Sequence, residues 1–219
     1  NPFTTQIEPH DWIATYCHAL ARFDTVLLDF VRDVWSYVSI GYFKQRAVAG
    51  EVGSSTMPHK VNPIDFENAE GNLQLSNAQL AFLADKLQKS RMQRDLSDST
   101  VSRNVGAALA HHVLAYEEVQ VGLSRVALSE EACRKALEAT PELLAEPIQT
   151  ILRLHVDDDP YKRLLELTRG RAIGPAEMKA FVDGLDVEHG VKEQLRALEV
   201  TSYLGDAGKI ARKVLAMAE

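Results

Sequence analysis

Residues 11–43, DWIATYCHALARFDTVLLDFVRDVWSYVSIGYF, determine the fold class of this chain. The stretch contains no proline, and its first glycine is Gly41. Its apolar residues recur every three or four positions, which is the spacing of a helix with one apolar face. They are Trp12, Ile13, Tyr16, Leu20, Phe23, Leu27, Phe30, Val31, Val34, Trp35 and Val38. A helix of about 33 residues is about 50 Å long and needs partner helices along its length, so the stretch predicts a bundle.

Two more long helices are predicted downstream. Apolar residues at helical spacing run from Phe66 to Leu87 and again from Val101 to Val126. The polar connector KSRMQRDLSDST, residues 89–100, joins these helices. Residues 47–63, AVAGEVGSSTMPHKVNP, contain two glycines and two prolines and predict a long loop. Several aromatic residues on the apolar stripes are expected in the core: Phe23, Phe30, Trp35, Phe82 and Tyr116.

The pattern changes after Ser129, where short helical stretches are separated by proline and glycine. We place a domain boundary near Leu128, between a central helical-bundle segment at residues 1–128 and a small helical domain at residues 129–219. No alternating strand pattern is found. The predicted fold class is therefore all-α, with a long-helix bundle segment followed by a smaller C-terminal domain of short helices.

The composition narrows the possible functions. Hydrophobic residues form 46% of the chain, enough for a core, and the net charge of −7 argues against general binding to nucleic acid or membrane surfaces, which needs dense positive charge. Cys17 and Cys133 form no CxxC pair and no zinc-binding spacing, which fits a reducing cytosol. No signal peptide or membrane span is predicted. Because the chain opens at Asn1 without methionine, we expect a piece of a longer cytoplasmic protein.

The loop at residues 53–63, GSSTMPHKVNP, is the richest in chemical groups. It gathers hydroxyls, backbone donors, one ammonium and one amide into a short segment. It lacks the G-x-S-x-G of a nucleophile elbow and the G-x-x-x-x-G-K-[ST] of a phosphate-binding loop, so both enzyme classes are excluded. On composition alone, an ordinary surface loop is the simpler interpretation.

The connector is the second candidate site. Arg94 is followed by several residues that cap helices, and Arg103 comes one helical turn after Ser99, so the two side chains share a face. Free backbone N–H groups, a hydroxyl and a guanidinium at a helix N-terminus would form a cradle for phosphate or carboxylate. The alternative is a well-capped helix that carries a surface arginine.

These residues carry a resemblance to a known family. GSSTMPHKVNP at 53–63 resembles the signature of the fumarase/aspartase superfamily, G-S-S-x-M-P-x-K-x-N. IDFEN at 64–68, RDLSDSTVSRN at 94–104 and LAEPIQT at 144–150 are similar to the adenylosuccinate lyase family in particular, in its longer bacterial form. The resemblance covers essentially the whole chain and matches the second half of that family's chain.

The resemblance implies an activity in purine biosynthesis. It implies β-elimination of fumarate from adenylosuccinate, which gives AMP, and from the succinyl-aminoimidazole-carboxamide ribotide. A base removes a proton beside a carboxylate, and an acid protonates the departing nitrogen. No metal or organic cofactor, nucleic acid or membrane partner is implied. The family forms a homotetramer whose active sites are shared among three chains.

The resemblance also assigns residue roles. Ser54 is the base, and its alkoxide could be stabilised by backbone N–H groups and by the ammonium of Lys60. Lys60 and Asn62 would hold the carboxylate on which negative charge develops, and Glu67 would orient a catalytic histidine. Further substrate-binding residues are Gln6, Ser55, Val61, Asn68, Arg94, Ser99 and Arg103. The general-acid histidine belongs to the earlier half of the family's chain, and no segment here matches its surroundings.

Other interpretations stay open. The chain could be another superfamily lyase, such as argininosuccinate lyase, aspartase or fumarase, although an amino-acid lyase would not need the phosphate-type cradle. It could also be a catalytically silent helical scaffold, although intact Ser54, Lys60 and Asn62 speak against that. His111 and His112 diverge by about 100° on a helix, so they are expected to be core or surface residues and not a joint metal pair.

Overall fold

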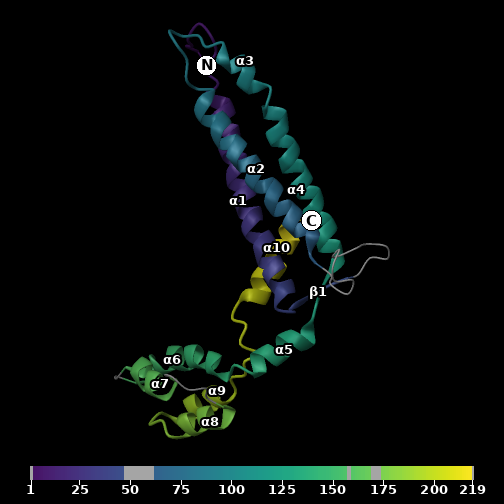
Figure 1. Cartoon of the computed structure of the whole chain (residues 1–219). Coiled ribbons are helices and arrows are strands. Elements are labelled where there is room, and N and C mark those ends of the chain that lie inside the picture. Colours follow the sequence, from purple (N-terminus) through teal and green to yellow (C-terminus); the bar gives the residue numbers. More distant parts are fainter. Residues whose placement is uncertain (1, 47–61, 157–158, 169–173, 219) are drawn as a thin grey trace. The chain divides into compact units, whose positions relative to one another are not determined.

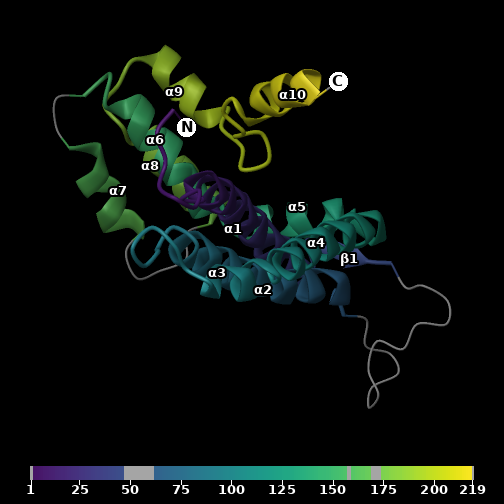
Figure 2. The same cartoon turned by 90° about the horizontal axis from the view of Figure 1, so that it is seen from above.

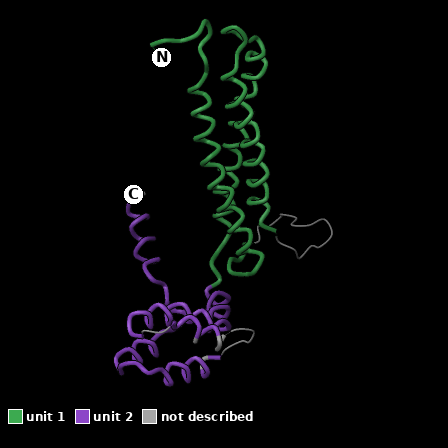
Figure 3. The backbone as a smooth tube through the Cα atoms, turned by 90° about the vertical axis from the view of Figure 1, so that its left-hand side faces the viewer, with its two compact units in different colours: residues 1–129 green, residues 130–219 purple. Residues whose placement is uncertain are grey.

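The computed structural model of the protein describes residues 2–46, 62–156, 159–168 and 174–218 (Figure 1). It divides into two compact units, residues 1–129 and residues 130–219 (Figure 3). The interpretation of these units as two domains stays a prediction. Nearly all described elements are helices, and the predicted all-α class is confirmed.

Three long helices build the first unit: α1 (Asp11–Ser39), α2 (Ile64–Lys86) and α4 (Val105–Arg125). They lie side by side along their lengths, both in Figure 1 and from above in Figure 2. Hydrogen bonds between the helices show their relative directions: Arg32 of α1 bonds to Glu70 of α2, and Thr25 of α1 bonds to Asn77 of α2. α1 and α2 are therefore antiparallel. Arg125 at the end of α4 meets Asp65 at the start of α2, so these two helices are antiparallel as well.

Two apolar clusters form the core of this unit. One lies towards the C-terminal end of α2 and the other towards its N-terminal end. Fully buried Phe66 leans on α4 at Gly122, where an added Cβ would stand 2.8 Å from the ring atom Cζ. Such a distance is far inside van der Waals contact, so a glycine is required there for the two helices to approach this closely.

A buried polar group lies between the two apolar clusters. Asp24 of α1 is 0% exposed, and its carboxylate accepts from Ser76 Oγ at 3.0 Å and meets His112 Nδ1 at 2.5 Å. The His112 ring lies 4.2 Å from the ring of Tyr116, centroid to centroid. Burial, and then the negative charge of Asp24, raises the pKa of Tyr116 to about 12. His112 is thus a core residue, one of the two alternatives expected for it.

Two boundaries predicted from sequence are wrong. α1 ends at Ser39 and not at Phe43, because Gly41 takes φ 82° and turns the chain. Residues Phe43–Gln45 then form strand β1, which pairs antiparallel with β2 (Val126–Leu128), although no strand was expected. The third helix is also split, since α3 (Ser97–Ser102) ends at Ser102 and α4 starts anew at Val105.

The expected burial of the aromatic stripe is wrong for four of its five members. Tyr116 is half-buried, whereas the others face outward in this single chain, at 52% exposed for Phe23, 42% for Phe30, 40% for Trp35 and 56% for Phe82. Periodicity marks these side chains as apolar but does not say which neighbour covers them. The outer faces of the bundle therefore carry uncovered apolar surface.

The second unit consists of short helices. They are α5 (Glu130–Glu138), the 3₁₀ turn η1 (Pro141–Leu144), α6 (Ala145–Leu152), α7 (Pro160–Thr168), α8 (Pro175–Asp183), α9 (His189–Arg196) and α10 (Ala207–Ala218). The core of this unit includes Ile148, Leu152, Met178 and Leu195. A cavity of about 610 Å³ lies beside this core. Among the helices that the structure describes, none combines the length and the apolar character needed to span a membrane.

Candidate active site

The described candidate residues fall into two groups at opposite ends of α2. Asn62, Glu67 and Asn68 lie at its N-terminal end, which we call the signature end. Gln6, Arg94, Ser99 and Arg103 belong to segments around its C-terminal end, which we call the connector end, because Lys86 binds Asp98 of α3 there and Gln6 binds Gln93. Figure 1 shows α3 at this end of α2. α2 has 23 residues and is therefore about 34 Å long, so one chain does not bring the two groups together. Ser54, Ser55, Lys60 and Val61 lie outside the described residues.

The signature end is attached to both neighbouring helices. Asp65 in the first turn of α2 is buried, and both of its carboxylate oxygens accept from Arg125 Nη1 at 3.1 Å. Two residues later, the Glu67 carboxylate accepts from the indole N–H of Trp35 at 2.9 Å. These bonds hold the start of α2 against α4 and α1. The exposed side chains of Glu67 and Asn68 are therefore presented from a rigid helical surface.

At the connector end, a tight turn at residues 91–94 contacts the segment that carries Gln6. Arg91 and Arg94 exchange two backbone hydrogen bonds of 3.0 Å, and the two residues between them, Met92 and Gln93, have φ angles of 49° and 71°. Both angles are left-handed, as in a two-residue type I′ turn. The side-chain oxygen of Gln93 accepts from the backbone N–H of Gln6 at 3.1 Å, so the turn ties the segment that carries Gln6 to the residue before Arg94.

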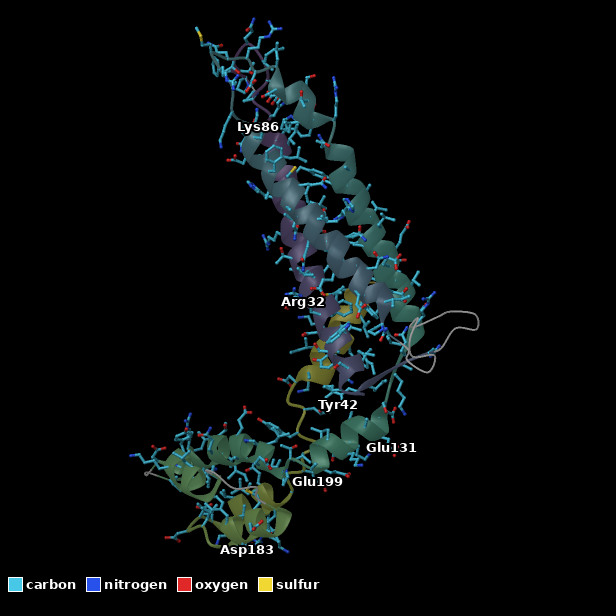
Figure 4. The ribbon with its side chains drawn as sticks, in the orientation of Figure 1. Arg32, Tyr42, Lys86, Glu131, Asp183 and Glu199 are labelled. Atoms are coloured by element: carbon cyan, nitrogen blue, oxygen red, sulfur yellow. The ribbon has the colours of Figure 1, made fainter. Side chains whose placement is uncertain are left out.

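Ion pairs from Lys86 hold the connector onto α2, and Figure 4 labels this lysine at the connector end of the helix. Its ammonium donates to Asp98 at 2.9 Å and to Asp95 at 3.3 Å. The hydrogen bond from the Ser97 backbone N–H, and then the ion pair with Lys86, lower the pKa of Asp95 to about 2. Hydrogen bonding to Asp98 leads the causes that raise the pKa of Lys86. Asp95 and Lys86 are therefore both charged at neutral pH.

The predicted cradle needs one correction. α3 begins at Ser97 with Leu96 at its N-cap, and the backbone N–H of Ser99 donates to the Leu96 carbonyl at 3.3 Å. Ser99 therefore lies inside the helix and offers no free backbone donor to a ligand. Ser99 and Arg103 remain one helical turn apart and both are exposed, so the hydroxyl and the guanidinium share a face.

Sequence reasoning missed the residues that support the signature end. Trp35 was interpreted as a core residue, yet its indole N–H binds Glu67. A row of hydrogen bonds also supports Asn68: His111 of α4 bonds to Asn72 of α2, and Asn72 bonds to Asn68. No local motif marks such partners, because they are paired by the relative register of separate helices. Within the described ranges, no three His, Cys, Asp or Glu side chains gather as a metal site would require.

Comparison with known proteins first gives the class. Residues 1–79 match the family model described as "Lyase". A solved structure of a fumarate lyase:delta crystallin from Brucella melitensis bound to cobalt shares the fold, with a TM-score of 0.56. It covers 84% of this chain and 40% of that chain, and its 22% sequence identity supports a shared fold alone. The chain thus has the fold of the fumarate lyases.

The second comparison gives the family. Residues 90–204, more than half of the chain, match the family model described as "Adenylosuccinate lyase C-terminal". The chain belongs to the adenylosuccinate lyase family, which confirms the resemblance drawn from the signature.

Relatives named adenylosuccinate lyase match nearly the whole chain. The one from Vibrio cholerae is 51% identical over 98% of this chain and 47% of its own length. The one from Escherichia coli K12 is 51% identical over 94% and 45%, and the one from Haemophilus influenzae is 48% identical over 98% and 47%. The chain therefore spans about half the length of the relatives it matches.

Proposed function

We propose that the whole protein is an adenylosuccinate lyase that eliminates fumarate from adenylosuccinate and from the succinyl-aminoimidazole-carboxamide ribotide. One observation carries the proposal: the chain is 51% identical, over 98% of its length, to an enzyme of that name. The signature residues Ser54, Lys60 and Asn62 are present in the sequence. A reducing cytosol is the proposed location, because purine intermediates are made there and Cys17 is a free, buried thiol.

The proposed elimination uses groups of the signature loop. Ser54 removes the proton beside a succinyl carboxylate, the electron pair forms the new carbon–carbon double bond, and the carbon–nitrogen bond breaks. A general acid outside this segment protonates the departing nitrogen. Lys60 and Asn62 stabilise the negative charge that builds on the carboxylate. Donors placed in this way are worth about 3–4 kcal/mol each in the transition state.

We place the two groups of one active site on different copies of the chain. The groups lie at the two ends of α2, a helix about 34 Å long, which exceeds the reach of one substrate molecule, so a single chain offers two half-sites. The exposed aromatic side chains of α1 and α2 supply apolar surface for helices of neighbouring copies. A homotetramer with shared active sites, as the resemblance implies, would unite the signature end of one copy with the connector end of another.

The connector end supplies the proposed phosphate site. Arg94 and Arg103 contribute two guanidinium groups, Ser99 a hydroxyl and Gln6 an amide, all from one exposed region. Guanidinium groups bind phosphate oxygens with paired, charge-assisted hydrogen bonds. A nucleotide substrate needs such a site, whereas the amino-acid substrates of other superfamily lyases do not. This favours the succinylated purine nucleotides as substrates.

The test measures fumarate release by the whole protein from adenylosuccinate, with argininosuccinate and aspartate as competing candidates. We expect turnover of adenylosuccinate alone, and a fall of about a thousandfold in kcat for Ser54→Ala, as befits loss of a general base. Ser124→Ala is the matched control, because its exposed hydroxyl bonds only to the Val121 carbonyl among the described residues. Turnover of argininosuccinate instead would assign another lyase activity, and turnover of none would favour the silent scaffold.

A further inference from the structure

A row of three polar side chains leads from α4 to the signature end of α2. His111 Nδ1 lies 2.7 Å from Asn72 Oδ1. Asn72 Nδ2 lies 2.9 Å from Asn68 Oδ1 and 3.0 Å from the backbone carbonyl oxygen of Asn68. Asn68 is exposed, whereas the bond between His111 and Asn72 is partly buried. We call Asn68, Asn72 and His111 the amide row.

Chemistry allows only one direction of donation along this row. A backbone carbonyl can only accept, so the Asn72 atom that faces the Asn68 carbonyl must be the NH₂ group. The Asn72 oxygen then faces His111, whose Nδ1 must carry a proton to donate. The Asn68 atom beside the Asn72 NH₂ must likewise be the oxygen. One fixed carbonyl thus determines the orientation of both amides and the site of the ring proton.

The consequence concerns the free half of the Asn68 amide. Its oxygen is occupied by Asn72, and in the part of the chain that the structure describes no group accepts from its NH₂. Without the row, the amide could rotate by about 180° about its terminal bond, because the two orientations of an asparagine amide differ little in shape. A rotated amide would present an oxygen, which repels an acceptor atom of a ligand.

We propose that Asn72 and His111 are positioning residues that hold Asn68 with its NH₂ group facing the substrate. This inference rests on the proposed function, and it adds the chemistry of the contact. The substrate atom met by Asn68 is a hydrogen-bond acceptor without a proton, such as a carboxylate oxygen or an unprotonated nitrogen. A neutral Nδ1–H imidazole and an imidazolium both supply the required donor, so the row persists in either state.

Two pairs of variants separate positioning from packing. His111→Asn keeps an NH₂ donor near the place of Nδ1, whereas His111→Gln carries its donor further out, near the place of Nε2. Asn72→Asp keeps the shape of Asn72 but replaces its donor by a carboxylate oxygen, which turns the NH₂ of Asn68 inward. We expect the KM for adenylosuccinate to rise at least about tenfold in His111→Gln and Asn72→Asp, with a smaller change in kcat, and to stay near the parent value in His111→Asn.

The readout of the parent enzyme comes first, so that failure of the proposed function is seen separately as absent turnover of adenylosuccinate. A second readout needs no activity: the ring ¹⁵N signals of His111, assigned by their loss in His111→Asn, should show a protonated Nδ1. An unprotonated Nδ1 would overturn the inference. So would an unchanged KM in both His111→Gln and Asn72→Asp, or an equal rise of KM in His111→Asn and His111→Gln at matched melting temperatures.

Discussion

The two ends of α2 hold their candidate residues by different means. At the signature end, partners come from neighbouring long helices: Trp35 binds Glu67, and the amide row reaches Asn68. At the connector end, a short exposed segment is held by ion pairs from Lys86 and by a left-handed turn. The first arrangement is built into the bundle and depends on helix register. The second depends on charge, and therefore on pH and salt.

The largest effect is expected at the buried polar group between the ends. Asp24→Ala leaves Ser76 and His112 without their acceptor in the core, so the free energy of unfolding should fall by about 3 kcal/mol. Chemical denaturation measures this fall, and hydrogen exchange should accelerate at both ends of α2 alike. Asp29→Ala is the matched control on the exposed side of α1 and should change stability by less than about 0.5 kcal/mol. Acceleration at one end alone would contradict the idea that Asp24 supports both ends of α2.

A smaller effect, confined to the signature end, is expected from Asp65→Ala. The change removes a buried acceptor that binds Arg125, at a cost of about 2 kcal/mol, and loosens the first turn of α2. Hydrogen exchange should accelerate around Glu67 and Asn68 but not in the connector. Equal acceleration at both ends would show that the two are not held independently.

Lys86→Met is expected to loosen the connector end and to leave the signature end unchanged. The variant keeps the apolar stem of the side chain but frees Asp95 and Asp98, so the connector should exchange faster and the KM for adenylosuccinate should rise severalfold. Lys89→Met, one turn away towards solvent, removes a pair with Asp85 only and should leave both quantities unchanged. If the two variants behave alike, the connector is held by something other than these ion pairs.

The smallest effect is the response of the connector to acid. The folded pKa of Asp95 is about 2, below the usual 3.8, so its stabilisation is complete above pH 3.8 and is lost as the pH falls through about 2. NMR signals of the connector should therefore shift with a midpoint near pH 2, and the signals of Asn68 should not share that midpoint. Asp95→Asn should abolish this midpoint, and a midpoint near 3.8 in the parent protein would refute the assignment.

Sequence reasoning predicted the long helices well, because periodicity over 20 residues or more is a strong signal. It missed strands β1 and β2, since a three-residue strand has no readable pattern and its pairing partner lies far away in the chain. It missed the break at Arg103, where no proline or glycine marks the end of a helix.

The candidate site was predicted unevenly. The resemblance named its residues, but their separation into two ends follows only from α2 being one unbroken helix. The supports of those residues were missed because they depend on the register between helices: Trp35 was interpreted as core, and His111 as core or surface. The Lys86 ion pairs were missed for the same reason, as nothing local links a helix end to the connector that follows it.

The contact between Gly122 and Phe66 has a consequence for mutational tolerance. Because a Cβ at position 122 would stand 2.8 Å from a buried aromatic ring, even alanine would force the Phe66 ring or the two helices to move apart. Gly106, in the same helix, would meet no atom within 4 Å, so alanine there should be accepted and should favour the helix by up to about 1 kcal/mol. A saturation library of α4 would thus show one glycine that accepts no replacement and one that accepts many.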